Sequence, residues 1–239
     1  MKFIELIKEK QADLYGKRQP SIAFLGDSVT HGCFGLYVKD GDIHTYVESG
    51  KAYHQKVKEI LAVLYPTVPI TIINAGISGD TAEGGLKRLD RDVLSYEPDL
   101  VIVCFGLNDS QQEEAGIKKY TDSLKKIFDN VKKTEKEVIF LTPNLKAASA
   151  EIKFEDKLKK MAEDIIENEK AGWLDKYLDA ARALCAEEMV PICDCNRIWN
   201  IFKDNGIKVN DLLSNRLNHP IEEMHFMFAY ELVRTMLLK

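Results

Sequence analysis

The sequence predicts an α/β protein of three layers, in which a central parallel sheet lies between two layers of helices. Short apolar runs, mostly of β-branched residues, alternate along the chain with longer segments of helical periodicity. Runs that are apolar at successive positions are typical of strands buried on both faces. Repeated β-α alternation with right-handed crossovers then places helices on both sides of the sheet.

The expected strands are short apolar runs of four to six residues. They are 21–25, 70–74, 100–105, 138–141 and 190–193. Because each run is apolar on both faces, we expect all of them to be buried between the helical layers.

The expected helices are recognised by apolar residues three and four positions apart. Segment 1–18 carries Phe3, Ile4, Ile7 and Leu14 at this spacing and predicts an N-terminal helix. A capping-type Thr81 begins another helix. The helices expected after the first strand are 54–64, 81–94, 113–133, 152–170, 173–188 and 221–238.

The composition indicates one globular domain spanning 1–239. The hydrophobic fraction is 45% and the charged fraction 30%, which excludes a disordered chain, a collagen-like fibre and a disulfide miniprotein. The net charge of −5 argues against a nucleic-acid partner, which normally meets a basic face. No apolar run approaches the roughly 18 residues that span a bilayer, and no linker marks a domain boundary.

The N-terminus and the cysteines predict a cytoplasmic protein. Charges interrupt the first apolar residues, so no secretory signal is recognised. The odd number of cysteines, five, suits a reducing compartment. Cys193 and Cys195 are separated by one residue and lack a second Cys/His pair, so no metal site is expected there. No cofactor is expected either, and the sequence leaves the oligomeric state open.

Polar residues follow the first expected strand, where a parallel sheet binds its ligands. Ser28 lies in the turn Gly26-Asp27-Ser28-Val29-Thr30-His31-Gly32. Its hydroxyl and its backbone N–H are expected to face the cleft, at the start of a helix. The alternative is that Asp27 or Ser28 only caps that helix. His31 is too close along the chain to serve Ser28 as a base and is interpreted as a pocket or structural residue.

Two further donors follow the next two strands. Gly79, in Ser78-Gly79-Asp80-Thr81, can offer a backbone N–H that no side chain obstructs. Asn108, in Gly106-Leu107-Asn108-Asp109, can offer a neutral amide to a developing oxyanion. The alternatives are a plain turn before a capped helix and an Asx-turn.

His219 lies just before the last expected helix, followed by Pro220. Its unperturbed pKa near 6.5 suits the transfer of protons at neutral pH, although a lone loop histidine is often simply solvated. Together, Ser28 as nucleophile, His219 as base and an oxyanion hole of Ser28, Gly79 and Asn108 form a complete set for acyl transfer.

This ordered set resembles the GDSL, or SGNH, hydrolase superfamily, named after its signature Ser, Gly, Asn and His. The corresponding residues are Ser28, Gly79, Asn108 and His219, and the first block reads GDSVTHG rather than GDSL-x-x-G. The resemblance implies a flavodoxin-like fold and a serine esterase, lipase or acylhydrolase that forms an acyl-serine intermediate. It does not fix the substrate, a small-molecule ester.

One departure from the family concerns the triad acid, which usually precedes the histidine by three residues. Arg216 occupies that position and cannot accept a hydrogen bond from an imidazole. Asp211, Glu222, Glu223 or a backbone carbonyl then remain as partners of His219. The last of these would leave a Ser–His dyad, and we favour the dyad or Asp211.

The segment 34–53 lacks clear periodicity and separates Ser28 from its following helix. Its tyrosines, Tyr37, Tyr46 and Tyr53, could wall the pocket, or the segment could be a surface insertion without a substrate role. A polar, aromatic wall favours short acyl (acetyl) esters, such as those of carbohydrate, over long acyl chains.

Three alternatives stay open. One is a lysophospholipase or thioesterase of the same superfamily. Another is a catalytically silent member that only binds a ligand. The last is a nucleotide or flavin binder, which the absence of G-x-x-x-x-G-K-[ST] and G-x-G-x-x-G from the first two turns disfavours.

Overall fold

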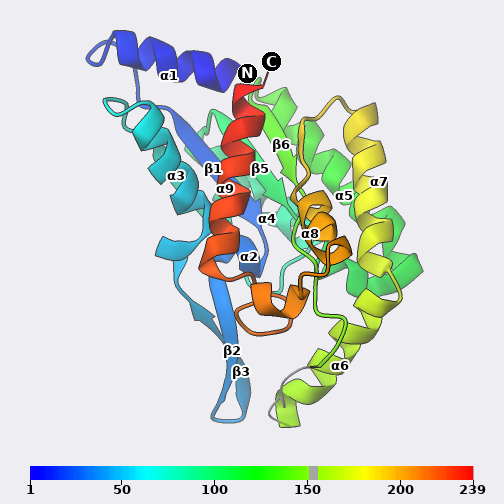
Figure 1. Cartoon of the computed structure of the whole chain (residues 1–239). Helices are drawn as coiled ribbons and strands as arrows, with labels where there is room; N and C mark the ends of the chain where they lie inside the picture. Colours follow the sequence, from blue (N-terminus) through cyan, green and yellow to red (C-terminus); the bar gives the residue numbers. More distant parts are fainter. Residues whose placement is uncertain (151–155, 239) are drawn as a thin grey trace.

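The computed structural model describes residues 1–150 and 156–238 (Figure 1). Over those residues the main sheet has five parallel strands in the order β4-β1-β5-β6-β7. The strands are β1 (Ser21–Gly26), β4 (Thr71–Gly76), β5 (Leu100–Cys104), β6 (Glu137–Leu141) and β7 (Ile192–Cys193). The chain adds β4 on one side of β1 and β5 on the other. This creates a switch point, where open α/β sheets bind ligands beyond the carboxyl ends of their strands.

Helices cover both faces of the sheet, which confirms the predicted three layers (Figure 1). Along β1, Ile22 and Phe24 contribute to one core, and Ala23 and Leu25 to the other. The first core is covered by α1 (Lys2–Ala12), α3 (Tyr53–Leu64), α8 (Cys195–Asp204) and α9 (Glu222–Leu237). The second is covered by α4 (Ala82–Asp92), α5 (Glu113–Lys133) and α7 (Trp173–Glu187).

The prediction that every strand is buried on both faces is wrong for β4. Thr71 and Asn74 are exposed, and the intervening Ile72 and Ile73 are only half-buried. Among the described strands, β4 pairs only with β1 and therefore forms an edge of the sheet. An apolar run shows that a strand is present but not how many neighbours it has.

Segment 34–53 is more regular than the sequence indicated. β2 (Cys33–Lys39) and β3 (Asp42–Val47) form an antiparallel hairpin that projects from the same end of the molecule as α6 (Asp156–Lys170) (Figure 1). A 3₁₀ turn, Ser49–Lys51, follows it. The hairpin carries no clean alternation because most of its residues are partly exposed on both faces.

The described helices differ from expectation in two places. α1 ends at Ala12, so Leu14 lies beyond it and is exposed. α8 was not expected, although Cys195 and Trp199, four residues apart, are both fully buried. Of the helix expected at 152–170, residues 152–155 lie outside the described part of the chain. The remaining short elements are α2 (Ser28–His31) and the 3₁₀ turns Leu94–Tyr96, Asp109–Gln112 and Val209–Leu212.

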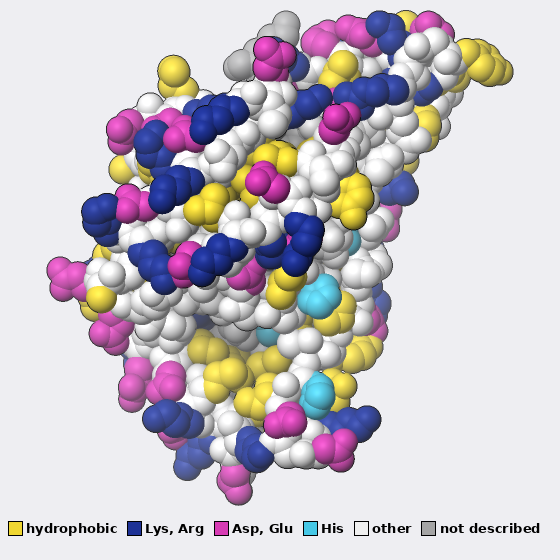
Figure 2. Space-filling view, turned by 180° about the vertical axis from the view of Figure 1, so that it is seen from behind, with side chains coloured by type: hydrophobic (Ala, Val, Ile, Leu, Met, Phe, Trp, Pro, Cys, Tyr) yellow, Lys and Arg dark blue, Asp and Glu magenta, His cyan; other side chains and the backbone are white. Residues whose placement is uncertain are grey.

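The surface carries both signs of charge. Figure 2 shows basic and acidic side chains intermixed over the back of the molecule. Ion pairs such as Lys118–Asp122 and Lys125–Asp129 run along α5, and Lys119 reaches Glu83 of α4. Among the helices that the structure describes, none has both the length and the apolar character needed to cross a bilayer.

Candidate active site

A cavity of about 680 Å³ lies beyond the carboxyl ends of the strands, within the range of small-molecule sites. Its lining includes all four predicted site residues, Ser28, Gly79, Asn108 and His219. They come from the loops after β1, β4 and β5 and from the loop before α9. The fold therefore brings together residues that are far apart in the sequence.

Ser28 is the first residue of α2 and is 6% exposed. Ser28 lines the cavity, and the Oδ1 atom of Asp27 caps α2 by accepting from the N–H of Val29 at 2.9 Å. The turn requires Gly26, since a Cβ there would lie 2.1 Å from Oγ1 of Thr30 and 2.8 Å from the carbonyl oxygen of Cys104. Burial raises the pKa of Asp27 to about 7.

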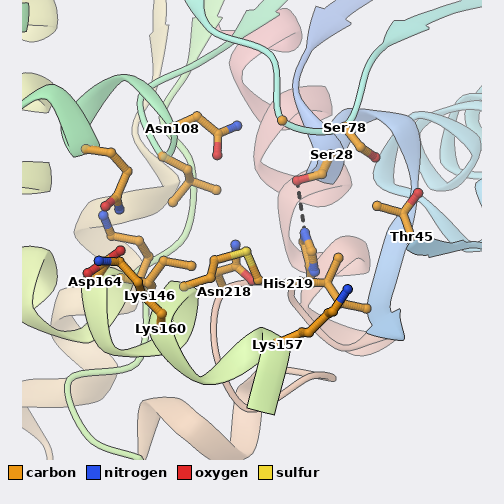
Figure 3. Close-up of a pocket in the computed structure, with 16 residues that line it drawn as sticks. Ser28, Thr45, Ser78, Asn108, Lys146, Lys157, Lys160, Asp164, Asn218 and His219 are labelled. Atoms are coloured by element: carbon orange, nitrogen blue, oxygen red, sulfur yellow. Dashed lines mark hydrogen bonds between the residues drawn. The ribbon is translucent and has the colours of Figure 1, made fainter. Parts of the chain in front are cut away.

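The Nε2 atom of His219 lies 2.9 Å from Oγ of Ser28 (Figure 3). The loop that carries His219 is closed by hydrogen bonds from the N–H of Ser214 to the carbonyl oxygen of His219 (2.8 Å) and from Ile221 to Leu212 (3.0 Å). Burial lowers the pKa of His219 to about 4, so the imidazole is neutral at pH 7. A neutral imidazole beside a hydroxyl is the arrangement that general-base catalysis needs.

Of the two favoured arrangements, the dyad or Asp211, the one with Asp211 as the partner of His219 is wrong. Asp211 forms an ion pair with Arg216, and Glu222 lies 3.0 Å from Nζ of Lys56. Within 1–150 and 156–238, no carboxylate or backbone carbonyl lies within hydrogen-bonding distance of a ring nitrogen of His219.

The group beside Nδ1 of His219 is instead the side-chain amide of Asn215, whose Nδ2 atom is 3.0 Å away. Sequence analysis missed this residue, because it precedes His219 by four positions rather than the family's three. The signal was an amide in the same loop block, next to the anomalous Arg216.

Gly79 and Asn108 form one wall of the cavity. Gly79 has φ +79°, and no other part of the described chain comes within 4 Å of where its Cβ would be. Asn108 donates through Nδ2 to the carbonyl oxygen of Asp80 at 2.9 Å. This bond ties the two loops together and leaves the second amide hydrogen of Asn108 available.

Two neighbouring residues support this wall. Asp109 accepts from the N–H of Ala82 at 2.9 Å and so fixes the start of α4. His31 contacts Oγ of Ser78 through Nδ1 at 3.1 Å and makes no hydrogen bond to Ser28 in the described structure, in line with a structural role.

Further parts of the cavity lining come from α6 and the hairpin. Lys157, Lys160, Met161, Asp164 and Ile165 of α6 line the cavity at helical spacing. This charged stripe of α6 therefore faces the cavity and is not only a solvated helix face. A charged helix face that meets solvent and one that lines a cavity have the same sequence pattern.

The hairpin contributes Leu36 and Thr45, which are paired across β2 and β3. Of the two alternatives for segment 34–53, the one in which its tyrosines wall the pocket is wrong. Tyr37 and Tyr46 are exposed and do not line the cavity. Tyr53 is buried, and its hydroxyl lies 2.7 Å from Oγ1 of Thr30. Adjacent strand residues face opposite ways, so Leu36 faces the cavity and Tyr37 does not.

Lys146 is a lining residue that the sequence did not indicate. It is 2% exposed, and its Nζ donates to Oγ of Ser110 (3.0 Å) and Oδ1 of Asn168 (2.6 Å). Burial lowers the pKa of Lys146, and the nearby Glu169 opposes this effect. These contacts anchor the loop after β6 to α6.

The chain matches known proteins over most of its length. The model of the GDSL-like Lipase/Acylhydrolase family matches residues 24–225. An acetylxylan esterase of Geobacillus stearothermophilus is 28% identical over 131 residues, which are 51% of this chain and 58% of that protein. The matched part thus spans little more than half of this curated relative.

Solved structures share the fold. A catalytic mutant of the acetylxylan esterase Axe2 from Geobacillus stearothermophilus, with an aspartate replaced by alanine, has a TM-score of 0.66 at 22% identity. That match covers 92% of this chain and 95% of the other. A two-domain esterase active on acetylated mannans has a TM-score of 0.67 at 21% identity, covering 98% of this chain and 52% of the other.

Proposed function

Because the chain belongs to the GDSL-like lipase/acylhydrolase family, we propose that it hydrolyses carboxylic esters through an acyl-serine intermediate, with Ser28 as nucleophile and His219 as general base. The observation that carries this proposal is the 2.9 Å contact between Oγ of Ser28 and Nε2 of His219 in an open cavity. Nucleophile and base within hydrogen-bonding reach are the signature of serine catalysis.

The proposed reaction has two halves. Nε2 of His219 takes the proton of Ser28 as Oγ attacks the ester carbonyl, and the resulting oxyanion is held by the N–H groups of Ser28 and Gly79 and by the amide of Asn108. His219 gives the proton to the leaving alcohol oxygen, which leaves an acyl-serine. Water then gives a proton to His219 as its oxygen attacks the acyl-serine, and His219 returns that proton to Oγ of Ser28 as the acid is released.

For the substrate, we propose short acyl esters, in particular acetyl groups on carbohydrate. The support is the mixture of side chains around the cavity. Gln111, Asn218, Lys160 and Asp164 offer donors and acceptors to sugar hydroxyls, as several polar groups do in sites for polar ligands. Relatives that act on acetylated xylan and mannans share the fold.

The nucleophile is tested by Ser28→Ala with p-nitrophenyl acetate as substrate and with a fluorophosphonate probe. Hydrolysis and labelling should both be lost while circular dichroism is unchanged. Ser95→Ala, at an exposed serine of the turn after α4, is the matched control and should keep both. Full activity in Ser28→Ala would refute the assignment.

The substrate class is tested by comparing acetylated xylo-oligosaccharides with esters of increasing acyl length. Activity should be highest with acetyl. An optimum at long acyl chains would instead favour the lysophospholipase or thioesterase reading, for which Leu36, Leu107 and Met161 would supply apolar lining.

One observation favours a second candidate, a member that binds esters without turning them over. Nδ1 of His219 faces an amide and not a carboxylate. The absence of fluorophosphonate labelling in the wild-type protein would support this candidate over the esterase.

A further inference from the structure

We propose that Asn215 is a positioning residue that holds neutral His219 with its proton on Nε2, so that the tautomer needed for base catalysis is only a minor state. A carboxylate at position 215 would then create a complete triad. The assignment of the tautomer does not depend on the proposed function. Only the expected effect on turnover rests on that function.

The orientation of the Asn215 amide is fixed by the loop it organises. Its Oδ1 atom accepts three backbone N–H bonds, from Leu217 (3.1 Å), Asn218 (3.0 Å) and His219 (3.0 Å). Turning the amide over would set its NH₂ group against these three donors, and an amide nitrogen cannot accept hydrogen bonds. The oxygen and nitrogen positions therefore follow from the hydrogen-bond network.

Both hydrogens of the amide nitrogen of Asn215 also have acceptors. Nδ2 lies 2.9 Å from Oδ1 of Asn218 and 3.0 Å from Nδ1 of His219. An amide nitrogen carries two hydrogens, so one goes to each neighbour. Nδ1 of His219 is then an acceptor, and in a neutral ring the single proton must lie on Nε2.

Among the residues that the structure describes, no competing group on Nδ1 reverses this assignment. The second neighbour is Sγ of Cys33 at 3.8 Å, and this thiol can donate to the carbonyl oxygen of Gly35 at 3.2 Å. Sulfur is a weak acceptor and the distance is long. Burial raises the pKa of Cys33 to about 11, so the thiol stays uncharged and does not attract a proton to Nδ1.

The consequence concerns the hydroxyl of Ser28. With its proton on Nε2, His219 donates to Oγ and cannot take the serine proton. The productive tautomer requires the proton on Nδ1, where it would face the hydrogens of Asn215. Turnover then scales with the small fraction of molecules in that tautomer. An amide in place of the triad acid, by giving the wrong tautomer, lowers kcat by about 10⁴ in serine hydrolases.

A residue at position 216, where the family carries its triad acid, does not take the place of Asn215 in this fold. Arg216 has φ +57°, and its guanidinium bonds Asp211 and, at 3.3 Å, the carbonyl oxygen of Asn210. A side chain at 216 therefore leaves the loop away from His219. The residue that meets Nδ1 is the one at 215.

The tautomer is measured directly by ¹⁵N NMR of wild-type protein with labelled histidine, in the pH range where His219 is neutral. We expect the proton on Nε2 of His219. A proton on Nδ1 would overturn the proposal. This readout needs no variant and no activity, so it stands even if the protein is not an esterase.

The consequence for catalysis is tested by Asn215→Asp. The new carboxylate keeps an oxygen for the three backbone donors, and the amide of Asn218 can rotate to donate to it. We expect the His219 proton on Nδ1, a kcat for p-nitrophenyl acetate at least 10²-fold higher with little change in KM, and an acid limb of the pH profile at higher pH.

Two variants control for other causes. Arg216→Asp adds a carboxylate one residue away and should leave the tautomer and kcat close to wild type. Cys33→Ala should also keep the wild-type tautomer. A folded Asn215→Asp protein with unchanged or lower kcat, or an equal gain in Arg216→Asp, would refute the positioning role. If wild type and Asn215→Asp both lack Ser28-dependent hydrolysis, the proposed function fails while the tautomer result remains.

Discussion

The side-chain amide of Asn108 donates a 2.9 Å hydrogen bond to the carbonyl oxygen of Asp80, the residue that follows Gly79. Asn108 belongs to the loop after β5 and Asp80 to the loop after β4, on opposite sides of β1. The bond holds the two proposed oxyanion donors in one geometry across the strand that leads to Ser28. Preorganised donors of this kind stabilise charge without reorganising during the reaction.

The first prediction concerns this bond. Asn108→Ala removes a proposed oxyanion donor and the tie to the Gly79 loop, so kcat for p-nitrophenyl acetate should fall by about 10²–10³ with a smaller change in KM. Steady-state kinetics measures both. Asn108→Asp keeps the shape but has no donor, and it should be impaired similarly. Wild-type kcat in both variants would remove Asn108 from the oxyanion hole.

A second prediction concerns the pH dependence of activity. Burial lowers the pKa of His219 to about 4, and His219 must be neutral to act as the proposed base. Protonation therefore inactivates the enzyme only as the pH falls toward 4. The acid limb of kcat/KM, which reports the free enzyme, should lie well below the ordinary histidine value of about 6.5. A limb at pH 6 to 7 would contradict this burial effect.

The third prediction concerns stability in acid. His54 is buried, and burial, aided by the charge of His31 and opposed by the backbone of Thr30, lowers its pKa to about 4. In the unfolded chain His54 binds a proton near pH 6.5. The stability that depends on a neutral His54 is therefore fully present above that pH and is lost as the pH falls through about 4. The full loss is about 3 kcal/mol.

Urea unfolding between pH 7 and 4 measures this loss. In His54→Leu the decline should be smaller by about that amount. His44→Gln, at an exposed histidine of the hairpin, is the matched control and should decline like wild type. Burial raises the pKa values of Asp27 and Asp109 to about 7, so their contribution to the free energy of unfolding increases as the pH falls. This contribution should be the same in all variants. Equal slopes in His54→Leu and wild type would contradict the prediction.

A fourth prediction concerns the turn before Ser28. In Gly26→Ala the new methyl group would overlap Thr30 and the backbone of Cys104. Overpacking of this kind costs about 1–3 kcal/mol, and the shift of α2 should lower kcat as well. Gly50→Ala adds a methyl group with no described atom within 4 Å and should change the free energy of unfolding little. Thermal and urea unfolding compare the two variants, and equal stability would show that the turn can relax.

Much of the fold was readable because burial on both faces leaves continuous apolar runs. The runs at 21–25 and 100–105 appear as β1 and β5 within one residue. The hairpin at 33–47 was not readable, because its strands are half-exposed on both sides and carry no period. The edge position of β4 depends on strand order, which local sequence does not encode.

By itself the sequence determined the layered α/β fold and the four residues that line one cavity, Ser28, Gly79, Asn108 and His219, because each follows a strand or precedes the last helix in a recognisable block. Only the tertiary structure decided what faces the other side of His219. Which side chain reaches Nδ1 depends on the path of the loop and on the three N–H groups that fix Asn215, and hydrogen-bond direction in a closed loop has no counterpart in residue spacing.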